Sequence, residues 1–224
     1  MGIISVEQTN RLYWLGRYAE RVYTLVRCYF KSYDTMIDEI RESYHDFCQM
    51  IDIPDIYKDK QDFMKSYPFD ENNPDSIISN LIRAYDNAIV LRESIGSESL
   101  SYIQLAIYEM NKAKLSDAPL IELQFVIDNI LAFWGMIDDK LDDDHVRNII
   151  KSGKRIERFD LYARLGLGRE VLVREANRMI PRIEKSGMDI KKDRLEEIRK
   201  AVEEQEVLSG RLNGALFIRL FQAA

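Results

Sequence analysis

Apolar side chains recur every three to four residues along most of the chain, which is the period of an α-helix packed on one side. No clear alternation of apolar and polar positions, as in a half-buried strand, emerges. The first series predicts a helix from about Val6 into the forties. Its inner positions are Leu15, Tyr18, Val22, Leu25, Tyr29 and Tyr33, continued, either directly or after a bend, by Ile37, Ile40, Tyr44, Phe47 and Ile51.

Residue types preferred at helix starts mark the next helices. Asn73 as N-cap and Pro74 at the first helical position predict the start of a second long helix. A third helix is expected after Ser97 and a fourth from about Pro119. The expected inner positions of the second are Ile77, Leu81, Tyr85, Ala88 and Ile95, and those of the fourth are Ile127, Ile130, Trp134, Ile137 and Leu141.

The last third of the chain continues the helical pattern. Helices are expected over residues 154–165, 168–186 and 189–213, with a break at Ser152-Gly153 and a turn at 166–168. Pro181 is expected to kink or end the sixth helix. Glycine and proline are scarce, at 10 and 5 residues, which suits long helices with few turns. We therefore predict an all-α, up-and-down bundle of about six to eight helices, built as one domain over residues 1–224.

Composition narrows the classes of partner and compartment. The 224 residues carry a formal charge of −6, and no basic run occurs, which argues against nucleic acid as a primary partner. The first residues lack the apolar core of a signal peptide, and no run of 18 apolar residues predicts a membrane span. With only Cys28 and Cys48, a reduced cytoplasmic protein is the expectation.

One short pattern, Gly-x-x-x-Glu-Arg, occurs twice, from Gly16 to Arg21 and from Gly153 to Arg158. In the first copy, Arg17, Glu20 and Arg21 fall opposite the apolar positions of their helix. With the neighbouring Trp14, the two arginines could form an exposed surface that faces an anion or a substrate. The alternative is a solvated helix face on which Glu20 partly pairs with Arg17.

The second copy lies in a segment that is apolar nearly all round, so its Arg158 is expected to be buried and to need a counter-charge. Arg92 poses the same question, because it lies among the apolar positions of the second helix. A buried ion-pair network that fixes helix register and a ligand site with binding arginines both fit the pattern. The candidate counter-charges are Glu20, Glu93, Glu98 and Glu157.

A metal site is a weaker alternative. Glu42-x-x-His45 and Asp142-x-x-His145 resemble the Glu-x-x-His motifs of di-metal bundles. The helical register places Glu42 away from the core, and Asp142 lies in an acidic run near a helix end. Phosphate loops, nucleophile elbows and Cys-x-x-Cys motifs are absent from the sequence. We therefore expect no metal and no cofactor.

The segment from Thr9 to Arg21 resembles the opening of the bacterial alpha-E family, an all-helical family with a Glu-Arg motif. Gly153–Arg158 is similar to the family's second such segment, although Lys154 stands where members usually have arginine. The middle of the chain, including Arg92-Glu93, extends the resemblance to roughly residues 5–180. Members tend to be longer at the C-terminus.

The resemblance implies a genomic setting rather than a reaction. The resemblance implies that such proteins are encoded beside, or fused to, ATP-grasp-like ligases and transglutaminase-like proteins. One hypothesis is therefore an accessory bundle that docks on such a ligase through Trp14, Arg17 and Arg21. The other is an enzyme in which Glu20 or Glu157 performs acid–base chemistry on a carboxylate or phosphate held by the arginines.

Overall fold

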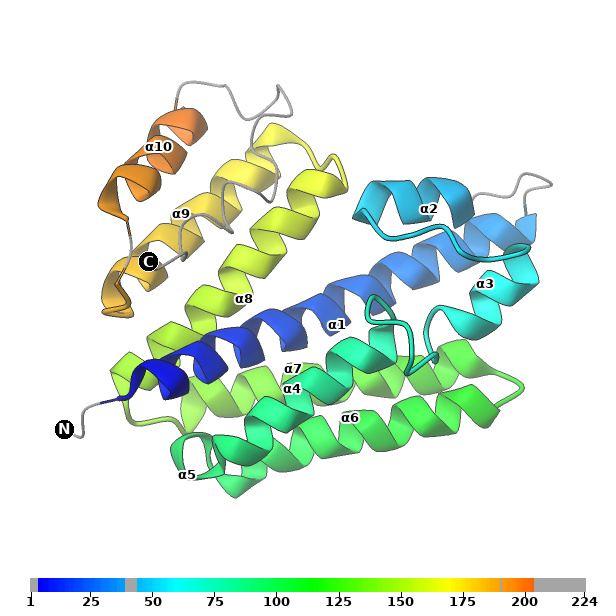
Figure 1. Ribbon diagram of the computed structural model, residues 1–224, viewed down its shortest axis with the longest axis horizontal. Coiled ribbons are helices and arrows are strands. Elements are labelled where there is room, and N and C mark those ends of the chain that lie inside the picture. The colour runs from blue at the N-terminus through cyan, green and yellow to red at the C-terminus, as the bar shows by residue number, and fades with distance from the viewer. Residues whose placement is uncertain (1–3, 39–43, 190, 204–224) are drawn as a thin grey trace. The chain divides into compact units, whose positions relative to one another are not determined.

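A computed structural model describes residues 4–38, 44–189 and 191–203, apart from the side chains of 34, 36–38, 192, 194 and 201–203. Across these ranges every regular element is an α-helix (Figure 1), so the predicted all-α class is confirmed. The described residues fall into two compact units. The first unit comes from Met1–Arg17 and Asp143–Ala224, and the second comes from Tyr18–Asp142. The prediction of one domain stays a prediction.

The first unit contains the start of α1 (Val6–Asp38), together with α8 (Asp144–Arg164), α9 (Arg169–Lys185) and α10 (Lys192–Glu203). Asp143 caps α8, because its side chain accepts hydrogen bonds from the backbone N–H groups of the first turn. Gly166, at a φ of 62°, turns the chain between α8 and α9, which pack side by side as a hairpin (Figure 1). The expected turn at 166–168 is therefore confirmed.

The second unit contains the rest of α1 and six further helices. These are α2 (Tyr44–Ile51), α3 (Lys60–Ser66), α4 (Ile77–Val90), α5 (Arg92–Ile95), α6 (Ser97–Leu115) and α7 (Pro119–Asp139). Helices α4, α6 and α7 share a core, in which predicted positions of α4 and α7 such as Ile77, Leu81 and Ile130 are buried. Around α2 and α3 the core is aromatic, with closely packed rings from Tyr29, Tyr44, Phe47, Phe63 and Tyr67.

Several predicted helix starts need correction. The helices after Ser97 and from Pro119 are confirmed, but α4 begins later than predicted. Its N-cap is Ser76, whose Oγ accepts from the Ser79 N–H at 3.1 Å, whereas Asn73 closes a turn before the helix. The described part of α1 runs to Asp38 and α2 begins at Tyr44, so the expected continuation through residues 39–43 lies outside the described residues. The short helices α3 and α5 were not predicted.

The predicted breaks in the last third also need correction. Ser152 and Gly153 lie inside α8, which begins ten residues before the expected start at 154. The expected 168–186 helix is confirmed as α9, and Pro181 lies inside this helix and does not end it. The alternative that Pro181 kinks the helix stays a prediction. The end of the expected 189–213 helix lies partly outside the described residues.

Helix α7 is the one described helix long and apolar enough to cross a membrane, judged by length and composition only. Its buried face, which includes Ile130 and Trp134, packs in the core of the second unit, as a core helix of that composition does. A single such helix is weak evidence for a membrane span. The expectation of no membrane span stays a prediction.

Candidate functional site

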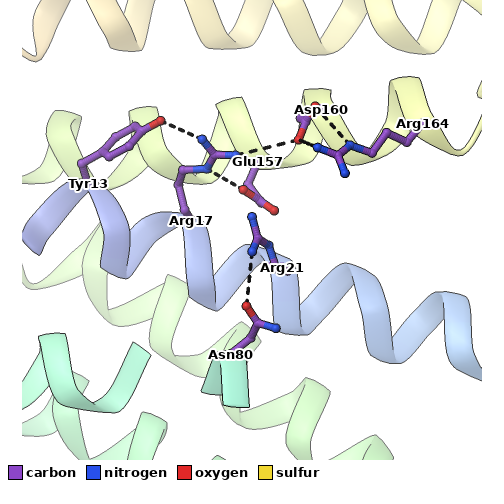
Figure 2. A network of polar contacts seen from close by, with 7 residues as sticks. All are labelled: Tyr13, Arg17, Arg21, Asn80, Glu157, Asp160 and Arg164. Carbon is purple, nitrogen blue, oxygen red and sulfur yellow. Dashed lines mark hydrogen bonds and ion pairs between the residues drawn. The ribbon is translucent and has the colours of Figure 1, made fainter. Parts of the chain in front are cut away.

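The side chain of Arg17 joins the start of α1 to α8 within the first unit. Its Nε donates to Oε2 of Glu157 at 2.5 Å, and its Nη1 donates to the hydroxyl oxygen of Tyr13 at 3.0 Å. Its Nη2 lies 3.8 Å from Oδ2 of Asp160. Figure 2 shows the guanidinium between these three groups. The first residue after the glycine of one motif copy is therefore paired with the glutamate of the other.

This pair is buried. Arg17 is 5% exposed and Glu157 is 0% exposed. Burial on its own would lower the pKa of the Arg17 guanidinium, but the charge of Glu157 and the Tyr13 oxygen outweigh it and raise that pKa above its ordinary value. Arg17 is therefore a permanent cation, and removing either member of the pair would take the nearest counter-charge from a buried charged group.

Asp160 and Arg164 extend the network along α8. Arg164 donates to both carboxylate oxygens of Asp160, from Nη2 at 3.1 Å and from Nε at 3.4 Å. Burial and the nearby Glu157 raise the pKa of Asp160, although Arg164 and Arg17 oppose the shift. The network thus alternates two guanidinium groups with two carboxylates.

Two glycines allow α1 and α8 to approach closely. A Cβ atom on Gly16 would collide with the carbonyl oxygen of Ile150 and lie 3.0 Å from the backbone nitrogen of Lys154. A Cβ atom on Gly153 would collide with the carbonyl oxygen of Tyr13 and lie 3.1 Å from the backbone nitrogen of Arg17. Each glycine therefore faces the carbonyl three residues before the other glycine and the amide one residue after it. The first residue of each motif copy fixes the helix crossing.

Aromatic rings cover the guanidinium of Arg17. Its Cζ lies 5.3 Å from the ring centroid of Trp14 and 5.8 Å from that of Tyr13. The two rings meet edge to face at 5.6 Å. Tyr13 is buried, which raises the pKa of its phenol against the opposing charge of Arg17, whereas Trp14 is 38% exposed. Trp14 thus presents an open aromatic surface above a buried cation.

The Glu-Arg pair of the first copy lies in the second unit. Glu20 is fully buried, and its Oε1 accepts a hydrogen bond from Thr24 Oγ1 at 3.4 Å. Arg21 is half-buried, and its Nη1 donates to Oδ1 of Asn80 at 3.3 Å (Figure 2). Its Cζ lies 5.9 Å from the ring centroid of Tyr18. Both residues are therefore held by neighbouring side chains.

Three expectations about exposure are wrong. Arg17 and Glu20 lie on the polar side of α1, but this side is buried, so they do not form a solvated face or an exposed docking surface. Arg158 is half-buried rather than buried, and its neighbour Glu157 is the fully buried charge. Arg92 is exposed, because α4 ends at Val90 and the series of buried positions along α4 does not include Arg92. Its Nε donates to Ser97 Oγ at 2.9 Å.

The di-metal alternative gains no support. Among the described residues, no group of three or more His, Cys, Asp or Glu side chains could hold a metal ion. His45 contacts the carboxylate of Asp55, and Glu42 lies outside the described residues.

Sequence reasoning did not assign roles to Tyr13, Asp160 and Arg164. Helical spacing contains the missing signal: Tyr13 lies four residues before Arg17, Asp160 three after Glu157, and Arg164 four after Asp160. Residues at these intervals share a helix face. A polar series at i, i+3 and i+4 next to a motif residue therefore indicates further members of the same network.

Comparison with known proteins is consistent with this architecture. The profile of the Alpha-E family, described as a predicted alpha-helical domain with a conserved ER motif, matches residues 8–187. Both Glu-Arg pairs of the chain, Glu20-Arg21 and Glu157-Arg158, lie inside the matched region. No curated protein and no solved structure matches the chain. Because the match covers most of its length, the chain belongs to the Alpha-E family.

Proposed function

We propose that this protein is a non-catalytic accessory domain that docks on an ATP-grasp-type ligase, or on a transglutaminase-like protein, in the bacterial cytoplasm. The observation that supports the proposal is that the guanidinium of Arg17 is already bound by other side chains of the protein. All three nitrogens of its guanidinium face groups of the protein itself, namely Glu157, Tyr13 and Asp160. A guanidinium held in this way stabilises the helix crossing, and because Arg17 is only 5% exposed it is shielded from a substrate.

The glycine crossing supports the same interpretation. Gly16 and Gly153 bring two backbones together at the point where Arg17 reaches Glu157. In this interpretation, the repeated motif builds a rigid frame, and activity belongs to the partner. Buried ion pairs that fix one packing arrangement are a recognised use of such charges.

Trp14 is the residue that we assign to partner docking. Its ring is 38% exposed and rests on the buried cation of Arg17, so it is presented in one orientation. Pre-organised tryptophans are enriched among the residues that dominate binding energy at protein interfaces. This assignment keeps one residue of the expected docking surface and omits the buried Arg17.

The test is binding to a purified ATP-grasp-type ligase from the same organism. We expect co-purification of the full chain with the ligase, and a loss of at least about tenfold in affinity for Trp14→Ala, as for a central aromatic interface residue. Tyr108→Ala is the matched control, because Tyr108 is an aromatic residue of α6 that is 64% exposed. Circular dichroism and thermal unfolding establish that both variants fold.

Two outcomes contradict the proposal. The absence of binding at micromolar concentrations of both proteins removes the ligase as partner. Turnover of a carboxylate or phosphate substrate by the isolated chain, abolished by Glu157→Gln in a folded variant, identifies an enzyme instead.

A further inference from the structure

The positive charge of this acidic chain is concentrated in one helical hairpin. Helices α8 and α9 contain eleven Lys and Arg residues and six Asp and Glu residues, a formal +5, whereas the whole chain carries −6. The sequence contains no basic run because these residues are spread along two helices. Folding brings some of them together.

The densest group surrounds Glu175 of α9, and we refer to Glu175, Arg155, Arg174 and Arg178 as the Glu175 cluster. Arg155 donates from Nη1 to Oε2 of Glu175 at 3.0 Å, and Arg178 donates from Nη1 to Oε1 at 3.0 Å. Nε of Arg174 lies 3.8 Å from Oε1. The Glu175 side chain is 3% exposed, so three guanidinium groups share one buried carboxylate.

The cluster carries two more positive than negative charges. Burial and repulsion from Arg158 lower the pKa of Arg155, and Arg178 contributes to this repulsion, whereas Glu175 opposes it. The local field is therefore positive despite the carboxylate. Such a field attracts an anion.

The surplus charge is accessible. The side chains of Arg174 and Arg178 are 58% and 52% exposed, whereas that of Arg155 is 19% exposed. Glu175 thus holds the base of the cluster, while two guanidinium groups extend into solvent. Planar guanidinium groups offer paired N–H donors that match the oxygens of phosphate.

We propose that the Glu175 cluster binds a compact dianion and that a phosphate group is its best-matched ligand. Two negative charges neutralise the surplus, and the tetrahedral oxygens can accept from several guanidinium groups at once. The phosphate can be free or can belong to a small phosphate ester. This site is separate from the Arg17 network and does not rest on the proposed function.

A nucleic acid is a less suitable ligand. Single-stranded nucleic acids bind where aromatic side chains stack on bases beside a basic groove, and α9 contains no aromatic residue. Three arginines around one carboxylate cover a short stretch of one hairpin, which suits one phosphate group better than a long backbone.

Calorimetric titration of the full chain with inorganic phosphate, and separately with phenyl phosphate, tests the proposal at constant ionic strength in chloride. We expect saturable binding with one site for at least one probe. Arg178→Gln and Arg174→Gln should each weaken phosphate binding by about tenfold, the effect of losing one charge-assisted hydrogen bond.

Arg199→Gln is the matched control, because Arg199 is an arginine of α10 that is 41% exposed and pairs with Glu184. Binding of inorganic phosphate alone, or of phenyl phosphate alone, identifies which source of phosphate the site accepts.

Glu175→Gln separates ligand binding from a purely structural role. It removes the single negative charge and raises the surplus, so the variant should unfold at a lower temperature in chloride. Phosphate should then raise its unfolding temperature more than that of the wild type. If Glu175→Gln does not fold, the two arginine variants still decide the question.

The proposal is overturned by any of three results. These are no saturable binding of either phosphate probe, equal binding by wild type and Arg178→Gln, or binding of hexaglutamate or an oligonucleotide without binding of phosphate. The last result would assign the cluster to a macromolecular polyanion.

Discussion

Gly16 of α1 and Gly153 of α8 make the same contact with each other's helix. Each faces the backbone carbonyl three residues before its counterpart and the backbone nitrogen one residue after it. The two glycines begin the two copies of the Gly-x-x-x-Glu-Arg pattern. The sequence repeat therefore corresponds to a local symmetry of the helix crossing within the first unit.

Replacing Gly153 with alanine should destabilise the protein. The added methyl meets the backbone of Tyr13, which cannot rotate away, so the helices must separate. We expect a loss of about 1–3 kcal/mol from overpacking, which exceeds the gain of about 1 kcal/mol in helix propensity. Urea unfolding followed by circular dichroism measures the difference.

Gly135→Ala is the control for this substitution. Gly135 also lies inside a helix, α7, but a Cβ atom built on it has nothing within 4 Å. We expect it to be neutral or to stabilise the protein by about 0.5–1 kcal/mol. Equal effects of the two alanine substitutions would refute the close crossing.

Arg17 and Glu157 should be strongly coupled in a double-mutant cycle. Arg17→Met or Glu157→Gln alone takes the nearest counter-charge from a buried charged group, which costs about 3–5 kcal/mol. Arg17→Met combined with Glu157→Gln should lose less stability than the sum of the single losses. The free energy of unfolding of the four proteins gives the coupling.

Arg11→Met with Glu7→Gln provides the matching cycle on the surface. Arg11 and Glu7 form an exposed i, i+4 pair at 3.0 Å on the same helix. Their coupling should stay below about 0.5 kcal/mol. Additive losses at Arg17 and Glu157 would contradict the buried ion pair described above.

The helical part of this architecture could be predicted because burial on one side leaves a periodic trace. Ile127, Ile130 and Ile137 recur at that period, and all three are buried in the second unit. The four residues of α5 and the seven of α3 are too few to show a period. Gly153 looked like a break, because a glycine at a backbone crossing has the same one-letter signal as a glycine at a turn.

The candidate site could be predicted only in part. The repeated pattern identified Arg17 and Glu157, but amphipathic reasoning placed the charged side of α1 in solvent. The actual partner of Arg17 lies 140 positions along the chain, and no local pattern encodes such a contact. Burial of a charge becomes favourable only after both helices are in place, so it depends on tertiary structure.

Asp160 should make stability fall as pH rises above the ordinary carboxyl pKa. Its pKa in the folded protein is raised from 3.8 by burial and by Glu157. The folded state therefore binds a proton more tightly than the unfolded chain between these two pKa values. Deprotonation in that window costs folding free energy, and the cost persists at higher pH.

The measurement compares wild type with Asp160→Asn, in which this group cannot ionise. The free energy of unfolding of wild type minus that of the variant should decrease from about pH 4 upward until the raised pKa is passed, because only the wild type loses a proton that its folded state binds more tightly. Asp62→Asn is the control, because the pKa of Asp62 is lowered by backbone and side-chain hydrogen bonds, so its contribution should change in the opposite direction. A difference that increases with pH for Asp160→Asn would contradict the raised pKa.

Both cysteines should react slowly with iodoacetamide in the folded protein. Burial raises the pKa of the Cys28 thiol to about 11 and that of the Cys48 thiol to about 12, and both thiols are free. At pH 8 the thiolate of Cys28 is therefore about 100-fold less abundant than that of an ordinary cysteine. Mass spectrometry of each cysteine-containing peptide over time gives the two alkylation rates, and Cys48 should be the slower.

The same reaction in 6 M guanidinium chloride should be fast and equal at both positions, because unfolding restores the ordinary pKa of both thiols. Rapid alkylation of Cys48 without denaturant would mean that the aromatic core around α2 opens in the native protein.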